Sequence, residues 1–277
     1  MKLAFGPWEM VVAPDAGAAT LSLTRNGTDI LRPTPPGATD PFDRACFPLV
    51  PYANRIAFGT FEWEGRMHHI PHNHPGQAHP LHGTGWRERW TVEDQDDAAI
   101  TMQLAHAPDR HWPWRFSATH RLTLDTDGLT ATLALRNDDR AAMPAGLGFH
   151  PYFDKCGVTA LTFEAEQLWL ADEQMLPTTL APADHFGDWS TGQSLDRRDL
   201  IDHCFVGWRG RAVIARADGD IAVEGTDTPA LHFFVPPGEA FFCAEPVTAM
   251  PDAVNQGQPR VLAPGQTMHA TMRIANA

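Results

Sequence analysis

The residues best suited to proton-transfer chemistry in this sequence are two histidines in similar settings. His82 precedes Gly83 and lies two residues after Pro80, with Trp86 and Trp90 shortly after it, and His150 stands between Phe149 and Pro151. Aromatic neighbours and turn residues predict an apolar, enclosed environment for both rings. Burial keeps an imidazole neutral and able to exchange a proton. A core histidine bonded to a carbonyl would fit the segment around His150 equally well, so this pattern alone leaves both interpretations open.

Two carboxylates complete the candidate set. Glu245 follows the apolar segment Phe241–Ala244, and Asp202 is enclosed between apolar residues. A partly desolvated carboxyl has a raised pKa, which suits a general base working near neutral pH. Glu245 could instead be a hydrogen-bonded carboxylate at the edge of a sheet.

A cluster of histidines raises the question of a metal. Six of the 14 histidines lie between His68 and His82, and His72 and His74 have the spacing of two ligands on a strand. A metal centre of that kind would need a carboxylate a few residues later, and residues 75–78 supply none. We therefore predict no metal and no cofactor, with His68, His69 and His72 as solvated loop residues.

The elements that must position these side chains are strands. The 22 glycines and 24 prolines divide the chain into short segments whose apolar residues alternate with a period of two. The best example is Phe116–Leu124 and Leu129–Leu135 around Asp127-Gly128, which predicts a hairpin. Four more pairs follow the pattern: Trp90–Glu93 with Ile100–Leu104, Ala212–Arg216 with Ile221–Glu224, Leu231–Val235 with Ala240–Ala244, and Arg260–Leu262 with Met268–Ile274. Many short strands at hairpin spacing predict an all-β sandwich or barrel.

Length and charge narrow the class of protein. The 277 residues contain no linker-like stretch and no fixed-period repeat, so we expect one domain over 1–277. A net charge of −13 without a basic cluster argues against a nucleic-acid partner. No apolar run has the length of a membrane span or a secretory signal, so we expect no membrane partner and a cytoplasmic location. The four cysteines, far apart and without a C-x-x-C pair, are expected to be reduced thiols.

Five segments, in order along most of the chain, resemble the aldose 1-epimerases (galactose mutarotase-like proteins). They are Pro51-Tyr52-Ala53-Asn54-Arg55-Ile56 with Gly59 and Phe61; His79-Pro80-Leu81-His82-Gly83 with Trp86 and Trp90; Gly148-Phe149-His150-Pro151-Tyr152-Phe153; Ile201-Asp202-His203-Cys204-Phe205; and Ala244-Glu245-Pro246-Val247-Thr248. Each segment alone is a weak signal, whereas five in the right order are a strong one.

The resemblance implies a large antiparallel β-sandwich (the galactose mutarotase-like supersandwich) and a cofactor-independent isomerase that acts on a small-molecule monosaccharide. By motif, His150 would be the general acid and Glu245 the general base, with His82 assisting. Arg55, Asp202, Asn54 and Trp86 would bind the substrate. The chain is similar in length to the short bacterial branch, whose sugar preferences vary, and we expect a monomer or homodimer.

Three alternatives stay open at this point. A glycoside hydrolase would use Asp202 and Glu245 as its two carboxylates but would leave the motif histidines without a role. A non-catalytic sugar-binding protein would have no use for an acid/base pair. Within the epimerase interpretation, Arg44, Arg55, Arg87 and Arg89 could bind an anionic sugar such as a phosphate or a sulfo-sugar. We prefer a neutral hexose or pentose.

Overall fold

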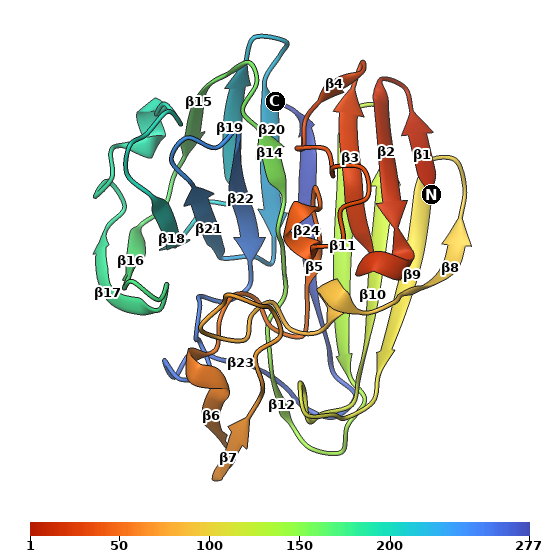
Figure 1. Cartoon of the computed structure of the whole chain (residues 1–277), viewed down its shortest axis with the longest axis vertical. Coiled ribbons are helices and arrows are strands. Elements are labelled where there is room, and N and C mark those ends of the chain that lie inside the picture. Colours follow the sequence, from red (N-terminus) through yellow and green to blue (C-terminus); the bar gives the residue numbers. More distant parts are fainter.

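Two large antiparallel sheets dominate the computed structural model, which describes residues 1–277 (Figure 1). The first has eight strands, in the spatial order β15 (Val158–Phe163), β19 (Arg211–Arg216), β20 (Ile221–Thr226), β24 (Thr267–Asn276), β11 (Gly128–Asn137), β10 (Phe116–Leu124), β9 (Ala99–His106) and β8 (Thr91–Gln95).

The second sheet carries the candidate residues. Its order is β17 (Pro177–Pro182), β16 (Gln167–Ala171), β18 (Ile201–Val206), β21 (Ala230–Val235), β22 (Phe241–Val247), β13 (Gly148–Phe149) and β5 (Pro48–Leu49), and β14 (Tyr152–Asp154) also pairs with β22.

Smaller elements complete the architecture. A four-stranded sheet contains β1 (Lys2–Phe5), β2 (Trp8–Ala13), β3 (Ala19–Arg25) and β4 (Thr28–Asp29), and two-stranded sheets join β6 (Thr60–Trp63) to β7 (Arg66–His69) and β12 (Met143–Ala145) to β23 (Arg260–Leu262). The helices are single 3₁₀ turns: η1 (Pro14–Ala16), η2 (Pro41–Asp43), η3 (Ala57–Gly59), η4 (Gly85–Arg87) and η5 (Trp189–Thr191). None of these helices has the length and apolarity needed to cross a lipid bilayer.

Strand alternation divides the apolar residues between two clusters. A core of 56 buried residues contains one face of each large sheet, for example Leu231 and Phe233 of β21. A second cluster of 12 contains residues from the other face of the second sheet, including Cys204 and Cys243. Because side chains alternate along a strand, the face that carries Cys204 and Cys243 also carries Asp202 and Glu245, which places both carboxylates outside the main core.

The predicted all-β sandwich is confirmed, and four of the five predicted strand pairs form. β10 pairs with β11, β8 with β9, β19 with β20 and β21 with β22. The fifth pair was wrong: β23 pairs with β12, whereas β24 inserts between β11 and β20. The turn at Pro264-Gly265 therefore carries the chain from one sheet to another. All four cysteines are free thiols, as predicted.

Candidate active site

A cavity of about 330 Å³ opens on the face of the second sheet that lies away from the main core. Strands β18, β21 and β22 contribute Asp202, His232 and Glu245 to its lining. The segment between β13 and β14 contributes His150, and His82 comes from a loop that crosses the same face. Residues from distant parts of the sequence thus meet around one polar cavity.

The register of β22 explains why His150 meets Glu245. Gly148 of β13 pairs with Val247, and Tyr152 of β14 pairs with Cys243. The residue midway between Gly148 and Tyr152 is His150, and the residue midway between Cys243 and Val247 is Glu245. Glycine at position 148 gives this close pairing room, because an added Cβ would lie 2.7 Å from Cγ1 of Val247 and 3.0 Å from the carbonyl oxygen of Pro246.

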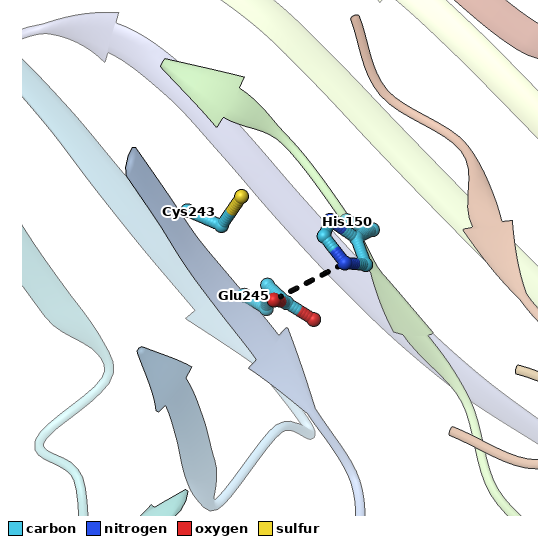
Figure 2. Close-up of side chains that lie close together, drawn as sticks. All are labelled: His150, Cys243 and Glu245. Carbon is cyan, nitrogen blue, oxygen red and sulfur yellow. Dashed lines mark ion pairs between the residues drawn. The ribbon is translucent and has the colours of Figure 1, made fainter. Parts of the chain in front are cut away.

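His150 and Glu245 form a buried pair. Figure 2 shows the imidazole facing the carboxyl group, and the distance from His150 Nε2 to Glu245 Oε1 is 3.4 Å. The imidazole stacks on Tyr152, with ring centroids 4.6 Å apart and an interplanar angle of 14°, and it also packs against Phe47. Glu245 is 1% exposed, and its Oε2 has no hydrogen-bond partner within the protein. Strand β22 therefore fixes the position of the Glu245 carboxyl group, and its Oε2 is left without a partner.

Burial favours the neutral form of both groups. Desolvation raises the pKa of Glu245 well above its ordinary value, and the nearby charge of Asp202 raises it further. Desolvation, followed by the neighbouring His232, lowers the pKa of His150 to about 3. These directions agree with the sequence-based expectation of a neutral imidazole beside a carboxyl of raised pKa.

The loop around His82 fixes one tautomer of that ring. The backbone N–H of Asn54 donates to His82 Nδ1 at 3.3 Å, so Nδ1 is the acceptor. The pKa of His82 lies well below its ordinary value because of burial, with the neighbouring His150 as the next cause. A neutral ring with an unprotonated Nδ1 carries its hydrogen on Nε2, so His82 brings a neutral N–H donor to the cavity.

Arg55, Asn54, Asp202 and His232 form the polar side of the cavity. His232 Nε2 lies 2.6 Å from Asp202 Oδ1, and Arg55 Nη2 lies 4.0 Å from Asp202 Oδ2. Asn54 Oδ1 accepts from the backbone N–H of Arg55 at 2.9 Å and from its Nη1 at 3.2 Å. Burial alone would raise the pKa of Asp202, but the bond from His232 and the charge of Arg55 outweigh it and lower the pKa. Asp202 is therefore ionised and held rigidly.

Cys243 adds a possible metal ligand to the acid/base pair. The ligand atoms of His150, Cys243 and Glu245 all lie within 4.8 Å of one another (Figure 2). Burial raises the pKa of both the Cys243 thiol and the Glu245 carboxyl, so a bound cation would have to displace two protons. His72 and His74 bind different partners, the carbonyl of Gln77 and the carboxylate of Asp40. The absence of a metal requirement stays a prediction.

Trp86 does not lie where a sugar could stack on it. Its side chain is fully buried, and its Nε1 donates to the carbonyl of Gly83 at 3.1 Å. The indole packs against Phe42 and Phe47, with centroid distances of 5.2 Å to each ring. Of these two, Phe42 lines the cavity. The loop that carries His82 turns the indole inward, so Trp86 supports the cavity wall by packing against Phe42.

Sequence reasoning missed four polar residues of the cavity: Asp43, Gln77, His232 and Arg32. His232 lies on β21 between the core residues Leu231 and Phe233, so strand alternation could have placed it on the cavity face. Arg32 follows β4 and reaches the cavity from the N-terminal part of the chain. Nothing in its sequence neighbourhood marks it as a site residue. Glu245 also lies inside β22, which ends at Val247, three residues later than the sequence indicated.

Comparisons with known proteins agree with this fold and these motifs. The family model described as aldose 1-epimerase matches residues 7–275. The uncharacterised protein YphB of Escherichia coli K12 is 32% identical over 94% of this chain and 93% of its own length, and human galactose mutarotase is 27% identical over 77% and 73%. The crystal structure of a candidate aldose 1-epimerase from Escherichia coli K12 superposes with a TM-score of 0.90 at 30% identity, covering 99% of this chain and 97% of its own. The chain therefore belongs to the aldose 1-epimerase family.

Proposed function

We propose that this protein is a mutarotase that interconverts the α and β anomers of a free aldose without a cofactor. The observation that carries the proposal is the buried His150–Glu245 pair on the wall of a cavity lined with polar side chains. Human galactose mutarotase is among the relatives of this chain, which supports the same class of reaction.

The reaction needs one group that takes a proton and one that gives a proton. Glu245 removes the proton of the C1 hydroxyl while His150 protonates the ring oxygen, and the C1–O5 bond breaks to give the open-chain aldehyde. Rotation about the C1–C2 bond exposes the other face of the carbonyl. Reclosure returns the two protons with the roles of the groups exchanged, so no atom or electron is gained or lost. Each positioned proton transfer accelerates such a reaction by about 10²–10⁴-fold.

The pair must move one proton to reach its working form. The raised pKa of Glu245 and the lowered pKa of His150 favour the form with the proton on Glu245, whereas the reaction as written begins with an ionised Glu245 and a protonated His150. The two forms have the same number of protons, so the second form is reached by proton transfer within the pair, and the attraction between the two opposite charges offsets part of the desolvation cost. Arg55 acts in the same direction, because its charge lowers the pKa of Glu245.

The other polar groups hold the sugar in a reactive orientation. His82 offers an N–H donor at the anomeric end, beside His150, since the two ring centroids are 5.2 Å apart. Arg55 and Asp202 provide a charged donor and a charged acceptor for hydroxyls, and Asn54 orients the Arg55 guanidinium. Fixed groups of this kind lower the barrier because they need not reorganise during the reaction.

Polarimetry on freshly dissolved single anomers of a panel of aldoses tests the proposal. We expect catalytic amounts of protein to accelerate the approach to the equilibrium rotation for at least one free aldose. The matching methyl glycoside, which cannot open, should show no change. Release of methanol from the glycoside would indicate a hydrolase, and a rate equal to that of buffer for every sugar would refute the proposal.

A further inference from the structure

Arg32 occupies an unusual position at the rim of the cavity. Its guanidinium carbon lies 4.1 Å from the ring centroid of Tyr152 and 4.5 Å from that of Phe241. Nη2 donates to the carbonyls of Phe42 at 2.6 Å and Arg44 at 3.2 Å. Two aromatic rings and two carbonyls therefore hold the guanidinium in one place, at the edge of a cavity whose lining it shares with both rings.

The charge of Arg32 has no counter-ion. Arg55, the other arginine of the cavity, has Asp202 at 4.0 Å, and Asp202 is also bonded to His232. Arg32 has no carboxylate within 4.0 Å, although Asp43 also lines the cavity. Its Nε is buried without an acceptor, and its Nη1 makes no hydrogen bond within the protein. A guanidinium partly removed from water, with unused donors, lacks the anionic partner that its planar fork binds best.

Tyr152 lies between Arg32 and the acid/base pair. The Arg32 guanidinium carbon is 4.1 Å from the Tyr152 ring centroid, which is 4.6 Å from that of His150, so the sum of the two distances, 8.7 Å, is the most that can separate Arg32 from the His150 ring. Both side chains line the cavity. A sugar whose C1 lies beside His150 and Glu245 can therefore place its far end, the substituent on its last carbon, against Arg32.

We propose that Arg32 is a substrate-binding residue that selects aldoses with a negatively charged group on the carbon farthest from C1. A carboxylate, a phosphate and a sulfonate share this chemistry, and each presents oxygens to the free donors of the guanidinium. The selection of an anionic sugar would depend on Arg32 itself, because the net charge of −13 makes the molecule as a whole unfavourable to anions. This inference rests on the proposed mutarotase function, and it reverses the preference for a neutral sugar drawn from the sequence.

The test compares kcat/KM for anomer exchange of glucose with that of three anionic counterparts: glucuronate, glucose 6-phosphate and 6-deoxy-6-sulfoglucose. We expect the wild-type protein to favour at least one anion over glucose, and the best of the three identifies the charged group. Raising NaCl should increase KM for that anion and not for glucose, because salt screens only the charged substrate.

Variants locate the selectivity on Arg32. Arg32→Gln should lower the ratio of anionic to neutral kcat/KM by about 10–100-fold, and Arg32→Lys, which keeps the charge but not the fork, should lower it by less. Arg198→Gln is the matched control, because it removes one charge from an exposed arginine outside this cavity and should leave the ratio unchanged.

A binding measurement covers the case in which loss of the bonds to Phe42 and Arg44 unfolds the Arg32 variants. Calorimetric titration of Glu245→Gln, in which Arg32 is intact, with the same sugars should show tighter binding of the best anion than of glucose. Equal affinities, or an unchanged ratio in folded Arg32→Gln, would overturn the role of Arg32 and leave the mutarotase proposal standing. Absence of anomer exchange with these four sugars and with every other aldose of the panel would refute the proposed function instead.

Discussion

Replacing Glu245 with glutamine removes one proton-transfer partner and almost nothing else. The amide has the shape of the carboxyl group, which is buried in the middle of β22 and 3.4 Å from His150 Nε2. Loss of the base should lower kcat by about 10²–10⁴-fold, or about 3–5 kcal/mol in activation free energy. The fold should persist, with a change in stability of about 1 kcal/mol and in Tm of about 2–4 °C, because no hydrogen bond to Oε2 is lost.

The assay is the polarimetric rate on the best aldose, with thermal unfolding measured on the same samples. His150→Ala should cause a loss of similar size, and the double variant should lose much less than the product of the two single effects, because the two residues act as a unit. A single variant with near wild-type kcat would refute the assignment of that residue. Strictly multiplicative losses would show that the two groups act in separate steps.

Four further predictions follow from the same structure. The value of kcat/KM should fall on the acid side only below pH 5, because the pKa of His150 is lowered to about 3 and the His150–Glu245 pair gains a second proton only in acid. A fall centred near pH 6.5 would show that the His150 ring titrates like an exposed histidine. Arg55→Lys keeps the charge but loses the bond pattern to Asn54 and Asp202, so kcat/KM should fall by about 10–100-fold, or ~1–3 kcal/mol. Burial lowers the pKa of His120 to about 4, so the neutral ring stabilises the fold fully above pH 6.5 and this stabilisation is lost as the pH falls. Between pH 7.5 and pH 5 the unfolding free energy of His120→Phe should therefore decrease by about 2 kcal/mol less than that of the wild type. An equal decrease in both proteins would contradict this prediction. Prolonged EDTA treatment and desalting should leave anomer exchange unchanged, whereas loss of activity restored by one added metal would reveal a centre at His150, Cys243 and Glu245.

Local patterns predicted the hairpins and not the sheet order. Alternation and a tight turn suffice to pair β10 with β11, because the partner strand is adjacent in the sequence. The pairing of β24 with both β11 and β20 joins segments far apart in the chain, and no turn residue records it. The erroneous pairing of Arg260–Leu262 with Met268–Ile274 has this origin, since a Pro-Gly turn marks a change of direction without saying which strands pair.

The site residues that could be predicted are those within motif segments. His150, Glu245, His82, Arg55, Asn54 and Asp202 all line one cavity, and their convergence follows from strand register and loop crossing that single motifs do not contain. Trp86 lies in such a motif, yet its direction depends on the conformation of residues 82–87, where His82 and Gly83 have positive φ values of 60° and 70°. An added Cβ at Gly83 would lie 2.1 Å from the carbonyl oxygen of Val50. Residue types alone predict neither the turn at His82-Gly83 nor the position of Arg32 at the rim of the cavity.

Exchange of magnetisation between the two anomeric protons of an aldose at equilibrium tests the central claim most directly. The NMR measurement needs no added reagent and reports only the interconversion of α and β forms. We predict exchange that increases in proportion to the concentration of the wild-type protein, falls to the rate in buffer for the His150→Ala/Glu245→Gln double variant, and is absent for the methyl glycoside. Exchange at the buffer rate with wild-type protein, or undiminished exchange with the double variant, would contradict the account.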